Sequence, residues 1–406
     1  MAALCIAAYG RAIALPFISD DYIQIRLARE YGPVSGWWQL AGDALYRCRA
    51  TSLVLTYWTE QLFGLNAFAF NASSLALHVI NTWLVFALGG WKRIGWRVST
   101  AAACYFAVYQ GHQEAVIWYA ALPELLVFGF SMMSVLCWMH WLESRRVSIY
   151  AAALGLYVLA LLSKESAVCV VPLIVLLAVL ERQGKRAAPY MVPFVVLAAL
   201  YFLMAHAARA SHLHFNDGTF SLTAPFWITT PRSVARMLWI SGGLSLVAML
   251  ALRARRWLVV AGMALVWMAV TLLPYSFLTY QPFVPSRHTY LASAGLALLA
   301  GAGFGLLRER VQSRAVVALV ALTVITTHWA YLWTRKHNQF ELRAEPTERL
   351  LEFAEGREGP IHVKCFPYSP EVANSALEVR LGPNAPKLHF NGQPELESLD
   401  LCDVRF

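Results

Sequence analysis

Residues 14–24 read ALPFISDDYIQ, an apolar run that ends directly at two aspartates, Asp20 and Asp21. Apolar runs near 20 residues recur along the chain, and each is long enough to cross a hydrocarbon core of about 30 Å. The sequence is 58% hydrophobic and 14% charged, whereas a soluble domain has about 25% charged residues. The chain is therefore predicted to be a membrane protein, with the acidic pair at the membrane–water boundary.

The predicted fold class is an all-α polytopic bundle of about eleven transmembrane helices, because backbone polar groups in lipid must be hydrogen-bonded within each segment. For the first span, a cleaved signal peptide is the alternative, which Arg11 and the absence of a preceding basic region disfavour. Residues 51–64 are too short and too polar to span, and we expect an interfacial helix there, within an outer loop at 18–66. The predicted spans lie near residues 1–17, 67–89, 98–110, 121–142, 148–163, 166–180, 189–206, 233–252, 257–275, 289–307 and 315–333.

Basic residues divide the loops into two sets. Five short alternate loops hold 14 Lys and Arg residues, whereas the longer opposite loops hold nine. The positive-inside rule places the first set in the cytoplasm, and hence the aspartate pair and the chain after residue 334 on the extracytoplasmic side. The Lys-poor composition favours a bacterial inner membrane. The net charge of +9 then reflects contact with the lipid bilayer, and no clustered basic face indicates nucleic-acid binding.

The last part of the sequence differs from the rest. Residues 335–406 hold nine basic and twelve acidic residues and no apolar span. We divide the chain into a transmembrane bundle, 1–334, and a small extracytoplasmic α+β tail, 335–406. The sequence leaves a Cys365–Cys402 disulfide in this tail undecided, because the spacing of the two cysteines does not indicate a pair. The expected elements of the tail are helices at 345–356 and 369–382, the second capped by Ser369 and stopped by Gly382, and strands at 360–366 and 387–390.

Ionisable residues near membrane depth are costly, so they are candidates for function. Each also has a structural alternative: the aspartates could cap a helix, the loop pairs could solvate turns, and an arginine could extend to lipid headgroups. Acids and separate cations at one face suit an anionic ligand together with a group that must lose a proton. The candidates predicted on the outer side are Asp20, Asp21, His112, Glu114, Lys164, Glu165, Arg287 and His288.

The order of these segments resembles the membrane glycosyltransferases of the GT-C fold, in which an acidic pair follows the first span. It is more closely similar to protein O-mannosyltransferase-like enzymes and their relatives that carry tetratricopeptide repeats, over roughly residues 12–310. The first His of that group's loop motif is replaced here by Tyr109 or Gln110, and no repeat array follows the last span. The similar segments are FGLNAFAFNASSLALHVINTWLVFAL (63–88), YQGHQEAV (109–116), LLSKESAVCVVPLIVLL (161–177) and SRHTYLASAGLALLAG (286–301).

The resemblance implies transfer of a sugar from a polyprenyl-phosphate-linked donor to a hydroxyl acceptor on a protein, lipid or glycan. Asp20 or Asp21 would be the base, since adjacent carboxylates raise one another's pKa, and Lys164 and Arg287 would hold the donor phosphate. No tightly bound cofactor is expected, although a divalent cation, Mg²⁺ or Mn²⁺, on the aspartates is open. The residues expected to line the sugar or acceptor pocket are His112, Glu114, Glu165, His288 and Tyr290.

Two other functions compete with this interpretation. A transporter or flippase of lipid-linked sugars would place ionisable groups near mid-bilayer in two related halves, and the sequence shows neither feature. A non-catalytic GT-C-like scaffold would leave the outer acids and cations without a shared pocket.

Overall fold

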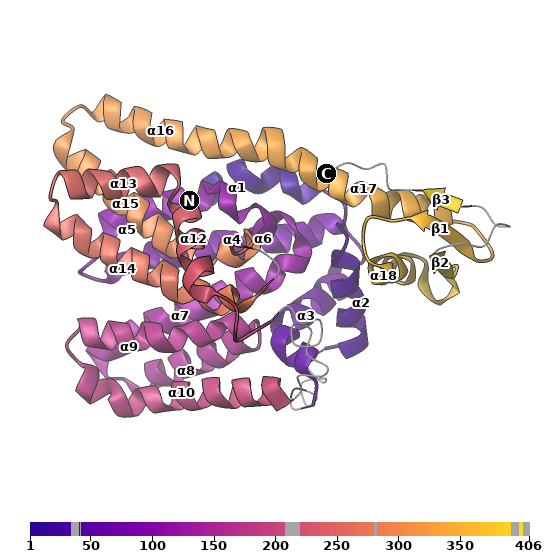
Figure 1. Cartoon of the computed structure of the whole chain (residues 1–406), viewed down its shortest axis with the longest axis horizontal. Coiled ribbons are helices and arrows are strands. Elements are labelled where there is room, and N and C mark those ends of the chain that lie inside the picture. Colours follow the sequence, from indigo (N-terminus) through magenta and orange to yellow (C-terminus); the bar gives the residue numbers. More distant parts are fainter. Residues whose placement is uncertain (34–39, 41, 208–219, 280–281, 391–397, 401–406) are drawn as a thin grey trace.

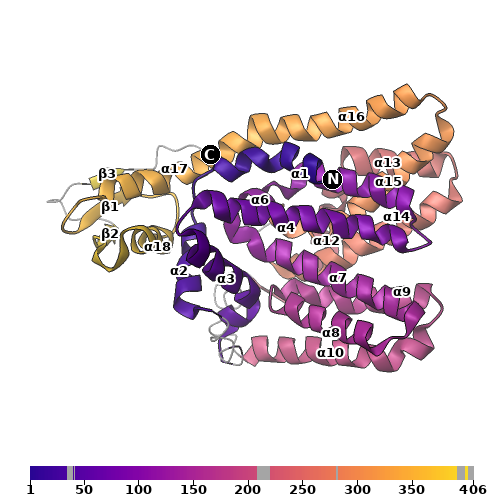
Figure 2. The same cartoon turned by 180° about the vertical axis from the view of Figure 1, so that it is seen from behind.

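A computed structural model describes residues 1–33, 40, 42–207, 220–279, 282–390 and 398–400. The long helices run along a common direction, and a smaller group of elements lies at one end of them (Figures 1 and 2). This end group contains α2 (Asp21–Tyr31), α3 (Ala44–Phe63) and a C-terminal unit with a small sheet.

The bundle helices coincide with the predicted apolar segments, which confirms the predicted fold class. Among the described residues, five helices have the length and composition to cross a membrane, or six if the bent pair α12–α13 is one span. The segments Ala2–Ala14, Val147–Leu161 and Glu165–Leu180 are apolar but shorter. The bundle comprises α1 (Ala2–Tyr9), α4 (Ala67–Ala87), α5 (Trp96–Val108), α7 (Leu122–Ser144), α8 (Val147–Leu161), α9 (Val170–Leu180), α10 (Gly184–Ala207), α12 (Phe226–Leu238), α13 (Ile240–Ala251), α14 (Arg255–Leu272), α15 (Ser293–Arg310) and α16 (Arg314–Tyr331).

One predicted span is wrong as a straight helix. Residues 233–252 contain a break at Trp239, where α12 and α13 meet at 88°. Gly242, just after the break, faces Leu296 of α15 so closely that an added Cβ would lie 2.8 Å from the Leu296 side chain. A hydrophobicity pattern cannot detect such a bend, because the residues on both sides of it are apolar.

The junction between the bundle and the C-terminal unit is a continuous helix. After α16, a π-helical turn (Leu332–Lys336) leads directly into α17 (His337–Ala354), so the predicted boundary at 334/335 lies within this helix. The bundle and the C-terminal unit are therefore joined without a loop, as the upper helix in Figure 1 shows.

The C-terminal unit has a parallel sheet of order β2-β1-β3, formed by β1 (Ile361–Cys365), β2 (Leu388–Phe390) and β3 (Ser398–Asp400). The expected strands at 360–366 and 387–390 are confirmed, whereas β3 was not predicted. The expected helix is α18 (Pro370–Leu381), whose N-cap Ser369 accepts a hydrogen bond from the Val372 N–H and whose C-cap Gly382 has φ +75°. Cys402, whose pairing with Cys365 the sequence left open, lies outside the described residues.

The outer helix α3 contains the segment expected to be interfacial but begins earlier, at Ala44, where Asp43 caps it by accepting the Tyr46 N–H at 2.9 Å. Its N-terminal half docks on the turn that follows α8. Thr51 hydrogen-bonds Ser163 at 2.7 Å. This contact fixes the turn that carries Lys164 and Glu165.

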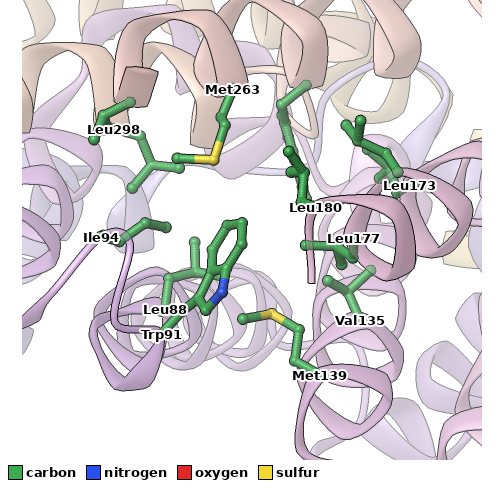
Figure 3. Close-up of a pocket in the computed structure, with 13 residues that line it drawn as sticks. Leu88, Trp91, Ile94, Val135, Met139, Leu173, Leu177, Leu180, Met263 and Leu298 are labelled. Carbon is green, nitrogen blue, oxygen red and sulfur yellow. The ribbon is translucent and has the colours of Figure 1, made fainter. Parts of the chain in front are cut away.

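The opposite end of the bundle carries the basic loops. The connections α9–α10, α13–α14 and α15–α16 lie there, away from α2, α3 and the sheet (Figures 1 and 2). A small apolar gap of about 40 Å³ lies among the helices near this end, with Trp91, Met139, Leu177 and Met263 around it (Figure 3). Its lining is apolar, so we interpret it as a packing gap. The candidate site lies at the other end.

Candidate active site

The apolar run of residues 14–18 ends in an unusual turn. Ser19 has φ +42°, a left-handed conformation that is uncommon for residues other than glycine. Asp20 stands at the N-cap position of α2, but its side chain makes no capping hydrogen bond. The capping alternative therefore does not describe Asp20. A strained residue directly before an acidic one often marks a functional site.

The two aspartates have different environments. Asp21 is only 1% exposed, and its two carboxylate oxygens accept the backbone N–H groups of Ile18 (2.8 Å) and Ala120 (2.7 Å). Burial raises the pKa of Asp21 to about 7, although both hydrogen bonds lower it. Asp20 is partly exposed. Burial also raises the pKa of Asp20, against the lowering effect of the positive charges of Arg287 and Arg343. A ligand can thus reach Asp20, whereas Asp21 holds the turn in place.

Two guanidinium groups lie over one tryptophan beside this turn. The Cζ atoms of Arg287 and Arg343 are 5.2 and 4.5 Å from the ring centroid of Trp118. Trp118 is itself held to the acidic turn, because its Nε1–H donates to the Ile18 carbonyl at 3.3 Å. The backbone N–H of Arg287 donates to Glu114 at 3.0 Å. Neither guanidinium forms an ion pair with another residue in the described part of the chain.

A second polar cluster is buried nearby. Lys164 forms an ion pair with Glu124 at the start of α7, and His288 Nδ1 lies 2.5 Å from the same carboxylate. The Tyr275 hydroxyl donates to the other Glu124 oxygen at 2.7 Å, and its ring stacks on the imidazole of His288. Glu165, next to Lys164, pairs with Arg49 of α3 at 3.3 Å. The charge of Lys164 is therefore balanced within the protein.

This cluster forms the polar end of a cavity of about 290 Å³. The remainder of the cavity wall is apolar and aromatic, with Phe202 of α10 and Phe277 among its side chains. Such a cavity fits an amphiphile that has a long apolar chain and a polar head. The residues at its polar end are Lys164, Glu165, Ser166, Tyr275 and His288.

A short 3₁₀ turn, η8 (Arg287–Thr289), connects the two groups. Its first residue extends to Trp118 and its second to Glu124. The structure thus brings Asp20, Glu114 and Arg287 together on one side of the turn. It places Lys164, Glu165 and His288 on the other side.

Two predicted pocket residues lie elsewhere. His112 and Tyr290 are fully buried within the bundle, where His112 hydrogen-bonds Ser293 at 2.6 Å and Tyr290 hydrogen-bonds His78 at 2.7 Å. Their rings contact each other, with centroids 4.6 Å apart. These contacts hold α4, α15 and the segment before α7 together.

Sequence reasoning missed four residues of the site: Trp118, Glu124, Tyr275 and Arg343. Glu124 had a detectable signal, because a carboxylate at the start of a 23-residue apolar helix is costly. Trp118 and Tyr275 were indistinguishable from aromatic residues that anchor helices at the membrane interface. Arg343 had no signal, since it lies among many charged residues of the tail.

Comparison with family models and with curated proteins finds no match. Among solved structures, the chain is similar to ArnT from Cupriavidus metallidurans bound to undecaprenyl phosphate, with TM-score 0.54 and 14% identity, over 97% of this chain and 85% of that one. The apo form of the same protein gives TM-score 0.54 and 13% identity, over 96% and 84% of the two chains. The chain has the GT-C fold.

The archaeal oligosaccharyltransferase AglB from Archaeoglobus fulgidus, in complex with an inhibitory peptide and a dolichol-phosphate, is similar at TM-score 0.46 and 13% identity, over 92% of this chain and 60% of that one. The GT-C fold and the apolar helices identify a multi-pass integral membrane protein. The likeness to O-mannosyltransferase-like enzymes stays a resemblance of the sequence.

A divalent cation on the aspartates is not favoured by the side chains around them. The described residues contain no group of three or more His, Cys, Asp or Glu side chains that could hold a metal ion. Both oxygens of Asp21 already accept backbone N–H groups. Two guanidiniums act on Asp20, and their positive charge opposes binding of a metal cation there. We therefore assign the positive charge of the site to arginine and derive no step through Mg²⁺ or Mn²⁺.

Proposed function

We propose that the chain is a membrane glycosyltransferase that moves a sugar from a polyprenyl-phosphate-linked donor to a hydroxyl acceptor at the extracytoplasmic face. One observation carries the proposal: the charge of the Arg287 guanidinium acts on Asp20, a partly exposed carboxylate, and this guanidinium forms no ion pair within the described part of the chain. A proton acceptor and an anion-binding group thus adjoin each other. The GT-C fold supports this function, and the undecaprenyl phosphate bound by ArnT supports the class of donor.

Asp20 is assigned as the base and Asp21 as a positioning residue. A general base must reach the proton that it removes, and Asp21 is buried with both oxygens engaged. Asp21 ties the turn at residues 18–21 to Ala120, and the left-handed residue Ser19 directly precedes Asp20, which is partly exposed. Burial strengthens Asp20 as a base by raising its pKa, while the two arginines favour its ionised form.

In the reaction, the acceptor hydroxyl gives its proton to Asp20 as its oxygen bonds to C1 of the sugar. The bond from C1 to the phosphate oxygen breaks, and polyprenyl phosphate leaves with one more negative charge. A guanidinium stabilises that charge as it develops, and its planar donors match phosphate oxygens. Arg287 is the first residue assigned to this role.

We place the donor in the cavity that has a polar end and an apolar wall. With the prenyl chain along the apolar wall near Phe202 and Phe277, the phosphate would lie at the polar end formed by Lys164 and His288. Residue Arg287 is adjacent to that end. Because Lys164 is paired with Glu124, we assign it mainly to shaping the cavity and Arg287 to the phosphate.

The test is sugar transfer by purified protein in lipid nanodiscs, supplied with radiolabelled polyprenyl-phosphate hexoses and a bacterial envelope extract as acceptor. Asp20→Asn should lower transfer by about 10²–10⁴, the contribution of a positioned base, with an unchanged melting temperature. Glu30→Gln, an exposed change on the same helix, is the matched control. Normal transfer by Asp20→Asn would refute the assignment of the base. No transfer by the wild type with any of the donors would refute the function.

A further inference from the structure

We propose that the C-terminal unit contributes directly to the site, with Arg343 of α17 binding the donor phosphate together with Arg287. The inference rests on the proposed function and deepens it. It defines the anion-binding subsite as two guanidiniums over Trp118, and it assigns one of them to a part of the chain outside the bundle.

Arg343 reaches the acidic turn from α17. The Cζ atom of its guanidinium lies 4.5 Å from the ring centroid of Trp118 and 5.3 Å from that of Phe340, so two aromatic rings hold the cation beside the turn. Its backbone carbonyl accepts the Tyr368 hydroxyl at 2.6 Å, which fixes the helix to the loop after β1. The positive charge of Arg343 acts on both Asp20 and Asp21.

The charges around the two guanidiniums favour an anion. Two cations over one ring repel each other, and neither guanidinium forms an ion pair in the described part of the chain. Glu114 accepts the backbone N–H of Arg287, and Glu371 pairs with Arg26 at 2.9 Å. Asp20 and Glu114 both lie near the guanidiniums, but in the described part of the chain neither carboxylate forms a hydrogen bond with a guanidinium N–H. A phosphate between the two guanidiniums would take their paired N–H donors and offset the repulsion between their positive charges.

An irregular turn in the long helix precedes Arg343. The π-helical turn at Leu332–Lys336 adds a residue to the turn and so rotates the following residues around the helix axis. This turn is fixed in place, since Trp333 Nε1–H donates to the Ala7 carbonyl at 3.0 Å and the guanidinium of Arg11 lies over the Trp333 ring. Arg343 is therefore positioned from both sides, by the π-helical turn held on the bundle and by Tyr368 of the C-terminal unit.

The same interface holds the helix that follows the base. Tyr22 of α2 donates to Glu348 of α17 at 3.1 Å, and Arg26 of α2 donates to Ser375 of α18 at 2.9 Å. In Figures 1 and 2, α18 lies beside α2 at the end of the bundle. The C-terminal unit thus positions Asp20 and supplies a phosphate ligand through one surface.

The experiment measures binding of undecaprenyl phosphate to the full chain in nanodiscs, separately from sugar transfer. Arg343→Gln and Arg287→Gln should each weaken binding about ten- to a hundredfold, as expected for loss of a charged hydrogen bond. Arg343→Lys should recover part of it, because the charge remains. Arg349→Gln, on the exposed side of the same helix, should bind like the wild type, and undecaprenol, which lacks the phosphate, should bind all variants equally.

The outcomes separate this inference from the proposed function. Wild-type affinity in a folded Arg343→Gln variant would overturn the inference, whether or not the protein transfers sugar. Equal loss of undecaprenol binding would also overturn it, since the defect would then be structural. Binding that depends on Arg343, in a wild-type protein that transfers no sugar, would support the anion subsite and refute the glycosyltransferase. If Arg343→Gln does not fold, the Arg343→Lys variant decides: wild-type affinity and KM for the donor would overturn the inference.

Discussion

Replacing Asp21 with Asn tests the division of roles between the two aspartates. Asn keeps the size of the side chain but has one oxygen acceptor in place of two. The Ile18 or the Ala120 N–H therefore loses its partner. Leaving a buried N–H without its partner costs about 1–3 kcal/mol. Asn also removes the buried titrating group, and this second effect gives the prediction its pH dependence.

The sign follows from the pKa of Asp21, which burial raises from its ordinary 3.8 to about 7. Between these values the folded protein keeps a proton that the unfolded chain has released, so the stability due to Asp21 falls as the pH rises. At about 1.4 kcal/mol for each pH unit, the loss between pH 4 and pH 7 is about 4 kcal/mol. For a chain of this length that corresponds to about 5 °C in melting temperature. Asn does not titrate and has no such loss.

The assay is the melting temperature of wild type and Asp21→Asn in detergent from pH 4.5 to pH 8. The wild type should be more stable at pH 4.5, and its advantage should shrink by about 4 °C and reach zero or reverse by pH 8. Other acids titrate in both proteins, so they cancel in the difference. Glu30→Gln, which removes an exposed acid from the same helix, is the control, and its melting temperature should follow that of the wild type at every pH. A difference between wild type and Asp21→Asn that stays constant with pH would refute the burial argument.

Three further changes test other contacts. Ser19→Gly should keep activity and raise stability by about 1 kcal/mol because it relieves a left-handed conformation, whereas Ser19→Val should lower both; melting and transfer assays report the two effects. Glu124→Gln should destabilise by about 3–5 kcal/mol, since it leaves Lys164 without its buried partner; a Glu124→Gln/Lys164→Met protein that melts no higher than the single variant would contradict this. Ser369→Ala should cost about 1 kcal/mol through loss of the α18 cap, measured as faster amide hydrogen exchange in α18 alone; uniform exchange across the chain would argue against a local effect.

The sequence by itself determined the features that depend on local pattern. Long apolar segments gave the class of protein and the approximate place of the bundle helices other than the bent pair α12–α13, because a span needs only enough consecutive apolar residues to cross the lipid. The ends of α18 were predictable from Ser369 and Gly382, since caps act within a few residues. The acidic pair and Arg287 stood out because charges beside apolar runs are costly.

Only the tertiary structure decided which of these residues face one another. The difference between Asp20 and Asp21 depends on the Ala120 N–H, and the balanced charge of Lys164 depends on Glu124 at the start of another helix. Arg343 reaches Trp118 from α17, which follows the π-helical turn of a long continuous helix. Local patterns cannot report such contacts, because a side chain's partner across the fold is set by helix packing and not by its neighbours in sequence.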